Sequence, residues 1–194
     1  MKLAVVSSDI RGETDRLLSV TAAALRARGV RLSGATKVLV ENAPGAHACD
    51  MDLQVWPEGP QVSITQSLGE GSEGCRLNPA GIAQAVAEVE RRGEQPFDLF
   101  ILNKFGPQES EGHGFCGSIG TALERGAPVL VGVGLACREA FDAFAGGLAE
   151  TLPSDADAIL EWCLHAIARR DGAGASATAT DQPASPGAGK AQVL

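Results

Sequence analysis

Residues 4–20 read AVVSSDIRGETDRLLSV and bring together an apolar run, a glycine and the start of a helical pattern. The apolar run over residues 2–7 (KLAVVS) predicts a short buried strand. From Thr14 onward the apolar residues recur every three or four positions, which predicts an amphipathic helix that stops at Gly29. The stretch therefore predicts a strand, a tight turn and a helix, the unit that builds α/β folds.

The turn has the length of a phosphate-binding loop, whose pattern is G-x-x-x-x-G-K-[ST]. Residues 7–14 read SSDIRGET, so Gly12 and Thr14 match, whereas Ser7 and Glu13 replace the first glycine and the lysine. Backbone N–H groups at a helix N-terminus attract anions whatever the side chains are. A carboxylate at position 13 repels phosphate but is favourable for the helix itself. From these residues alone, an anion site and an ordinary helix-capping turn remain equal alternatives.

The rest of the chain alternates predicted strands with predicted helices. Residues 51–56 and 61–66 alternate in hydropathy and are joined by PEGP, which predicts a β-hairpin. This order predicts a three-layer α/β sandwich with a mostly parallel sheet and a β-hairpin insertion. From Asp171 small and polar residues dominate, so we expect a domain over 1–170 and a disordered tail over 171–194. The other strands are expected at 30–40, 98–103 and 128–133, and the other helices at 79–92, before 125, at 136–146 and after Ser154-Asp155.

Composition narrows the classes of partner. The net charge of −8 argues against nucleic acid or an anionic membrane as the main partner, because both need a basic face. No stretch approaches the roughly 18 apolar residues of a membrane span. An odd number of cysteines, five, widely spaced, does not form a disulfide framework. We therefore expect a cytoplasmic protein with reduced thiols.

Ligands of open parallel sheets bind beyond the carboxyl ends of the strands. We expect residues 7–14, 103–113 and 132–138 to meet at that edge. P-loop nucleotide hydrolases end one apolar strand in an acidic pair that binds metal and positions water, but here that strand ends in Asn103-Lys104. An acid thus occupies the lysine position and a lysine occupies an acid position. Three interpretations stay open: Glu13 and Lys104 pair if their strands are neighbours, Lys104 supplies the missing charge, or Lys104 is a surface residue.

The order of motifs over residues 2–150 resembles the small nucleoside-triphosphatase family of P-loop proteins first described in thermophiles. In that family the acidic pair is followed by Ile-Gly-Pro-Met-Glu and later by a Phe, and this chain has NKFGPQE at residues 103–109 and Phe115. The motifs HACDMDL (47–53), GCRLNP (74–79), NKFGPQESEGHGF (103–115) and AFAGGLAE (143–150) more closely resemble an uncharacterised bacterial family related to those NTPases. Members of that family are often encoded near molybdate transport genes. The resemblance implies the fold, a phosphate-loop position at residues 7–14 and the Glu109 position.

Two main hypotheses follow. In the first, the chain binds a small anionic ligand, either a nucleotide or a tetrahedral oxyanion such as molybdate, without efficient hydrolysis. In the second, it is a nucleoside triphosphatase in which Glu109 or Glu111 holds Mg²⁺ and Lys104 stabilises the phosphoryl group, so that Glu109 and Lys104 are catalytic. A third is an interaction scaffold whose partners are molybdate-transport or cofactor proteins. The predicted ligand-binding residues are Ser8, Asp9, Arg11, Gly12, Glu13, Thr14, Arg76, Asn103 and Lys104.

Metal binding is not predicted. His47, Cys49 and Cys75 lack the paired spacings of zinc sites, so a hairpin loop is favoured over a metal site. An oxyanion or base pocket that uses Arg76 is the other alternative there. His113, in a loop with two carboxylates, is either a general base or part of a solvated loop.

Overall fold

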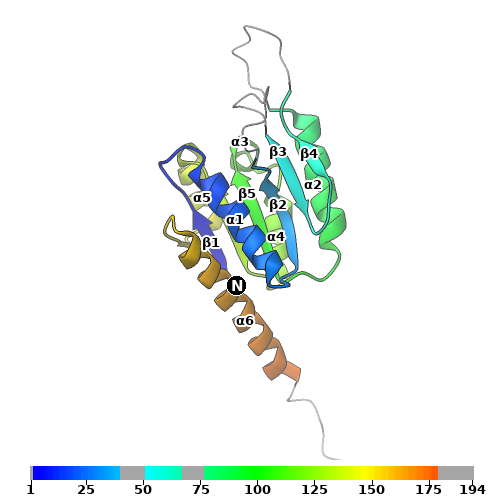
Figure 1. The fold of residues 1–194 in the computed structure, drawn as a ribbon, viewed down its shortest axis with the longest axis vertical. Helices are drawn as coiled ribbons and strands as arrows, with labels where there is room; N and C mark the ends of the chain where they lie inside the picture. Colours follow the sequence, from blue (N-terminus) through cyan, green and yellow to red (C-terminus); the bar gives the residue numbers. More distant parts are fainter. Residues whose placement is uncertain (1, 40–50, 67–76, 179–194) are drawn as a thin grey trace, which may run out of the picture.

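The computed structural model describes residues 2–39, 51–66 and 77–178. Its sheet has seven strands in the order β4-β3-β2-β5-β6-β1-β7. Figure 1 labels β4, β3, β2, β5 and β1 in this sheet. The strands are β1 (Leu3–Val6), β2 (Leu32–Lys37), β3 (Asp52–Trp56), β4 (Gln61–Ser63), β5 (Leu99–Phe105), β6 (Val129–Val133) and β7 (Ala149–Thr151). The helices are α1 (Glu13–Ala27), α2 (Pro79–Gly93), α3 (Pro107–Ser110), α4 (Cys116–Glu124), the 3₁₀ turn η1 (Leu135–Cys137), α5 (Arg138–Ala145) and α6 (Ala156–Thr178).

The sheet is parallel except at the hairpin. Strands β2, β5, β6, β1 and β7 pair in parallel, while β3 pairs antiparallel with both β2 and β4. The α/β fold with a mostly parallel sheet and a hairpin insertion is therefore confirmed. Strand β6 lies between β1 and β5, so the two strands that precede Glu13 and Lys104 are not neighbours.

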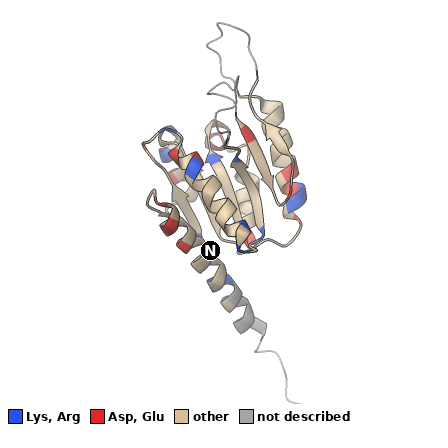
Figure 2. Cartoon of the chain, in the orientation of Figure 1, with Lys and Arg blue, Asp and Glu red and all other residues tan. Residues whose placement is uncertain are grey.

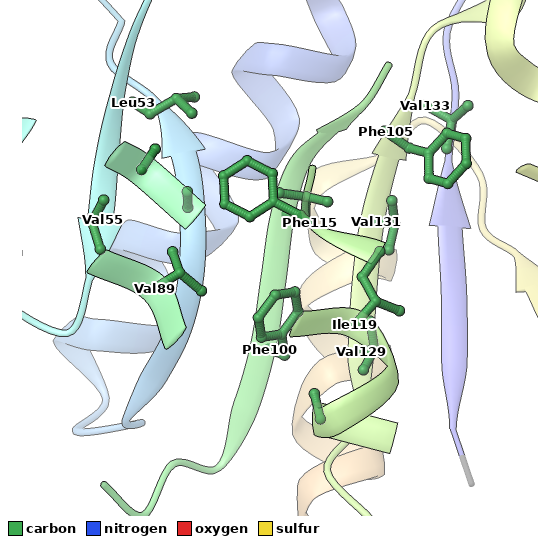
Figure 3. Packing of buried hydrophobic residues seen from close by; sticks show 14 of the residues in the cluster. Leu53, Val55, Val89, Phe100, Phe105, Phe115, Ile119, Val129, Val131 and Val133 are labelled. Carbon is green, nitrogen blue, oxygen red and sulfur yellow. The ribbon is translucent and has the colours of Figure 1, made fainter. Parts of the chain in front are cut away.

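Two apolar cores cover the two faces of the sheet. Along β1, Leu3 and Val5 face one core, whereas Ala4 and Val6 face the other, as the period of two in a strand requires. The first core packs the sheet against α2, α4 and α5, and Figure 3 shows Phe100, Phe115 and Ile119 in it. The second core packs the sheet against α1 and α6. Each large side chain that is fully buried in these cores contributes about 1.5–3 kcal/mol.

Helix starts agree with the local sequence signals. Asn78 caps α2 by accepting a hydrogen bond from the N–H of Ala80 at 3.1 Å, and Pro79 occupies the first turn. Such a cap contributes about 1 kcal/mol. Gly12 precedes α1 with a φ of 81°, a left-handed conformation that glycine adopts without steric cost.

Three segments differ from the expectations. Strand β5 continues to Phe105, and the expected loop after it contains the short helix α3. Strand β7 was not predicted, because Ala149-Glu150-Thr151 shows no apolar alternation, yet it pairs with β1. Helix α6 continues to Thr178, eight residues into the expected tail. Residues 179–194 lie outside the described residues, and the boundary at residue 170 stays a prediction.

Charged residues of both signs are mixed on the helix surfaces. Figure 2 shows acidic and basic residues close together on α1 and α2, where Glu13 pairs with Arg16 and Glu88 pairs with Arg91. Within the described part of the chain, no helix is long and apolar enough to span a membrane.

Candidate functional site

The turn after β1 is held by its own polar groups. The N–H of Ser8 donates to Thr14 Oγ1 at 3.1 Å, and the N–H of Ile10 donates to Ser8 Oγ at 3.2 Å. The N–H of Glu13 donates to the Ile10 carbonyl at 3.1 Å, which closes the last bend before α1. Thr14 is 8% exposed, so its hydroxyl is fixed beneath the turn. The turn therefore has the length and the glycine of a phosphate-binding loop and is already ordered by internal hydrogen bonds.

The outer part of this turn presents backbone donors to solvent. Asp9, Arg11 and Gly12 are exposed, and no hydrogen bond from their backbone N–H groups is found within residues 2–39, 51–66 and 77–178. These groups lie at the N-terminal end of α1, where the helix dipole favours an anion. The turn can therefore donate hydrogen bonds to an anionic ligand without breaking any that it already makes.

The negative charge of Glu13 is balanced by an arginine of its own helix. Its carboxylate accepts two hydrogen bonds from the Arg16 guanidinium, at 2.6 and 2.8 Å. That hydrogen bonding lowers the pKa of Glu13 below its usual value, so the side chain is ionised. The condition for a Glu13–Lys104 pair is not met, since β6 separates β1 from β5. The negative charge that seemed to oppose an anion is therefore balanced by a guanidinium one helical turn away.

Asn103 carries a buried carboxamide that lacks partners. The residue is 2% exposed, and neither Oδ1 nor Nδ2 has a hydrogen-bond partner in the described structure. A Cβ placed on Gly132 would lie 3.3 Å from Asn103 Oδ1 and 3.0 Å from Thr14 Cγ2. Asn103 and Thr14 therefore approach each other across the bare backbone of β6. A buried polar group without a partner costs about 1–3 kcal/mol, so a ligand or water that bonds to it gains that energy.

Asn103 is one of the residues that line a cavity of about 80 Å³ at the carboxyl edge of the sheet. A water needs about 10–15 Å³ on this measure, so the cavity has room for a small polyatomic ion. One side is polar and the other is apolar. The polar side consists of Asp15, Lys37, Asn103, Lys104, Gln108 and Glu109, and the apolar side includes Met51, Leu53, Ile64, Leu77, Ile82 and Phe115.

Two cationic side chains line the polar side. Lys104 is exposed, and within the described residues its ammonium has neither an ion pair nor a hydrogen bond. Lys37, at the carboxyl end of β2, pairs with Asp15 in the first turn of α1 at an Nζ–Oδ2 distance of 3.1 Å. An ammonium thus reaches the first turn of α1 from β2, although position 13 holds an acid. Beside Lys37, Thr36 Oγ1 accepts a hydrogen bond from the Trp56 indole Nε1 at 3.1 Å.

The Lys37–Asp15 pair was missed by the sequence reasoning. The same edge rule that selected Asn103 applies to the predicted strand over 30–40, whose polar residue near its carboxyl end is Lys37. The expectation covered residues 7–14, 103–113 and 132–138 but not the carboxyl end of this strand. That Lys37 meets Asp15 depends on β2 lying beside β5, which the alternation of elements alone does not determine.

Glu109 anchors the loop that follows β5. The side chain is 6% exposed, and its Oε2 accepts from the Gly106 N–H at 2.9 Å while Oε1 accepts from the Phe115 N–H at 3.0 Å. The carboxylate therefore joins the start of α3 to the start of α4. Cys116 lies next to it, and burial together with the Glu109 charge raises the pKa of the Cys116 thiol. A catalytic role for Glu109 stays a prediction, while its geometry shows a structural role.

The remaining predicted residues are placed as follows. Glu111 and His113 are exposed. Ser8 is half-buried in the turn. His47, Cys49, Cys75 and Arg76 lie outside the described residues. Among the residues that the structure does describe, no group of three or more His, Cys, Asp or Glu side chains could hold a metal ion.

Comparison with known proteins agrees with this architecture. Residues 3–162 match the model of a family described as protein of unknown function, DUF2478. The chain is 34% identical over 152 residues to molybdenum import ATP-binding protein ModC 2 of Bradyrhizobium diazoefficiens, a match that covers 77% of this chain and 17% of that protein. The solution structure of a human cancer-related nucleoside triphosphatase is similar with a TM-score of 0.56 and 13% identity, over 94% of this chain and 100% of that one. At that identity the likeness shows the fold alone. The chain belongs to the DUF2478 family, and its fold is similar to that of a nucleoside triphosphatase.

Proposed function

We propose that the chain binds a tetrahedral oxyanion group at the carboxyl edge of its sheet without efficient hydrolysis. The group is either a free oxyanion such as molybdate or the phosphoryl group of a nucleotide. The observation that carries the proposal is the unpartnered buried carboxamide of Asn103, a residue that is 2% exposed and lines the same cavity as Lys104. A hydrogen-bond donor and a cation in one small cavity fit a compact anion.

Two further features support an anion at this place. The exposed N–H groups of the turn after β1 lie at the N-terminal end of the 15-residue helix α1, and Asp15 in the first turn of that helix lines the cavity, whereas residues 7–14 do not. Lys37 supplies a second ammonium, whose Nζ lies 3.1 Å from Asp15 Oδ2. An incoming anion can share the Lys37 ammonium with Asp15, because an ammonium has three donors.

The carboxylates of the site support binding rather than turnover. Phosphoryl transfer needs acidic groups that hold Mg²⁺ and orient water. Asn103 is neutral, Asp15 is paired with Lys37, and both oxygens of Glu109 accept backbone hydrogen bonds. No acidic side chain among the described residues that line the cavity is therefore free of a partner.

The relative named above supports the molybdate source of the anion. The match spans 17% of a protein named for molybdenum import and ATP binding. In that protein, the matching region is therefore linked to a polypeptide several times its length. Linking two units in one chain raises their effective concentration, which is useful when they act on the same ligand or on each other. We accordingly propose molybdate-transport proteins as partners.

The test is isothermal titration calorimetry with molybdate, sulfate, ATP and GTP. We expect heat from at least one of them, and a loss of about tenfold or more in affinity for Lys104→Ala, since a hydrogen bond to a charged group contributes about 1.5–3 kcal/mol. Lys2→Ala is the matched control, because Lys2 is exposed at the opposite edge of the sheet. Binding of sulfate and molybdate alone assigns a free oxyanion, and binding of ATP or GTP alone assigns a nucleotide.

Two results would overturn the proposal. The first is no heat with any of the four ligands. The second is binding that Lys104→Ala and Asn103→Leu leave unchanged. Magnesium-dependent phosphate release above buffer, abolished by Glu109→Gln in a folded variant, would replace the non-hydrolytic part with the triphosphatase hypothesis.

A further inference from the structure

The apolar side of the cavity at the carboxyl edge is not accounted for by an oxyanion alone. Most of its apolar residues are buried in the core, but Met51 and Leu77 are only half-buried and keep accessible surface. They line the same cavity as the exposed Lys104 and the half-buried Lys37. A ligand in this cavity can therefore contact apolar surface as well as ammonium groups.

Met51 lies on the same face of the sheet as Lys37. Lys37 pairs with Leu53 across the antiparallel ladder of β2 and β3. The N–H of Val38 donates to the Asp52 carbonyl at 2.8 Å, which extends this ladder by one residue. Side chains two residues apart in a strand share a face, so Met51 is the diagonal neighbour of Lys37. Such neighbours lie about 7–8 Å apart, which is close enough for one small molecule to contact both side chains.

Hydrogen bonds of the hairpin hold Met51 and Leu77 side by side. The Met51 carbonyl accepts from the Ile64 N–H at 2.9 Å, and the Met51 N–H donates to Thr65 Oγ1 at 3.3 Å. Thr65 also forms an isolated antiparallel bridge with Leu77, whose carbonyl accepts from Gln66 Nε2 at 3.0 Å. Met51 and Leu77 thus both lie beside Thr65, and together they form the apolar wall of the cavity.

The apolar wall distinguishes an inorganic oxyanion from an organic one. An inorganic oxyanion loses water on the side of the wall, and neither a thioether nor an alkyl side chain donates a hydrogen bond in exchange. A carbon group attached to the anion gains free energy from the same contact, because apolar surface is removed from water. Small-molecule sites have this composition, with a largely apolar lining and a few polar groups that fix the orientation of the ligand.

We infer that the ligand of this site is an organic phosphate monoester with an apolar carbon group next to the phosphate. Lys37 and Lys104 bind the phosphoryl group, and the carbon group packs against the apolar wall. The inference rests on the proposed function and adds what the oxyanion is attached to. Inorganic oxyanions and nucleotides bind the same ammonium groups more weakly, because an inorganic ion has no carbon group and the sugar next to a nucleotide's phosphate carries hydroxyls.

The test is isothermal titration calorimetry on the full chain with methyl phosphate, phenyl phosphate and AMP at about pH 8, where each phosphate monoester is a dianion. We expect phenyl phosphate to bind about tenfold more tightly than methyl phosphate or AMP, the effect of removing a few methylene-sized groups from water. Phenol, which has the ring without the anion, should give no measurable binding.

Variants of the apolar wall separate the two parts of the ligand. Met51→Gln and Leu77→Asn keep the approximate size of each side chain but make it polar. Each should reduce the preference for phenyl phosphate over methyl phosphate about threefold and leave the affinity for methyl phosphate unchanged. Lys104→Ala should weaken both esters by the same factor. Leu148→Asn, which changes a leucine that is 63% exposed and does not line the cavity, is the matched control.

The outcomes distinguish this inference from the proposed function. The inference alone is overturned if methyl phosphate or molybdate binds but phenyl phosphate binds no more tightly, or if both wall variants keep the preference of the parent chain. Phenol that binds as tightly as phenyl phosphate also overturns it. If neither the phosphates nor molybdate binds, the proposed function fails together with the inference. Circular dichroism checks that each variant is folded, and the ligand series on the parent chain keeps the test decisive if a variant is not.

Discussion

Glu109 allows a quantitative stability prediction, because its carboxylate binds two backbone N–H groups and leaves no room for a side chain at position 114. Its two carboxylate oxygens accept the N–H groups of Gly106 and Phe115. Gly114 lies against the same carboxylate, and a Cβ added there would be 2.0 Å from Oε1. The perturbation is therefore a double-mutant cycle of Glu109→Ala and Gly114→Ala.

The magnitudes follow from these contacts. Glu109→Ala removes two hydrogen bonds to a charged acceptor, so the free energy of unfolding should fall by about 3–6 kcal/mol. Gly114→Ala should cost about 1–2 kcal/mol for its φ of 57°, and about 1–3 kcal/mol more for displacing the carboxylate. The second contribution disappears once Glu109 is alanine. The double variant should therefore be more stable than the sum of the single changes predicts, by about 1–3 kcal/mol.

Urea unfolding measures all four corners of this cycle, with stability obtained from the midpoint and the slope. Glu111→Ala is the matched control, since Glu111 is an exposed glutamate in the same loop. Its effect should stay within about 0.5 kcal/mol. Additive single effects, or a cost for Glu109→Ala no larger than that for Glu111→Ala, would refute the loop-anchoring role.

Three further predictions test the packing, the charges and the thiols. Gly81→Ala places a Cβ 2.2 Å from a backbone oxygen of β4 and should lower the free energy of unfolding by more than about 2 kcal/mol. The Cβ of Gly120→Ala meets no atom within 4 Å, so this helical change should raise the free energy of unfolding by about 0.5–1 kcal/mol. Equal melting temperatures for the two variants would contradict this prediction. The Arg31 guanidinium lowers the pKa of Asp98 in the folded state, so the stabilisation is present above the unfolded value of about 3.9 and is lost as the pH falls through the folded pKa. Asp98→Asn should therefore cost about 1 kcal/mol at pH 7, with a difference that closes as the pH falls through the lowered pKa of Asp98. Parallel pH–stability curves would count against the pair. Burial raises the pKa of Cys163 to about 12, so iodoacetamide should modify this thiol only when the protein unfolds. Peptide mass spectrometry measures the labelling, and rapid modification of the native protein would disprove the burial of Cys163.

Local signals were sufficient for most of the fold. The Asn78-Pro79 start of α2, the apolar run of β5 and the hairpin around PEGP each depend on neighbouring residues, and the structure confirms them. Strand β7 could not be predicted, because three residues without apolar alternation carry no pattern. Its position is set by pairing with β1, which is a tertiary effect.

The candidate site was only partly predictable. The pairing of Glu13 with Arg16 was readable from their spacing of three residues on one helix. The approach of Asn103 to Thr14 across Gly132, and of Lys37 to Asp15, depends on which strands are neighbours. Sequence periodicity gives the type of each element, whereas the order of strands in the sheet decides which side chains share a cavity.

The hydrogen bond between Trp56 and Thr36 has a practical consequence. It joins an indole to the residue next to Lys37, and the same ring lies 4.9 Å from the Arg26 guanidinium. Trp56 and Trp162 are the two tryptophans of the chain, so Trp162→Phe leaves one intrinsic fluorophore, which is hydrogen-bonded to the residue next to Lys37. Fluorescence emission from that indole can then report whether a bound ligand has displaced the Lys37 ammonium from Asp15.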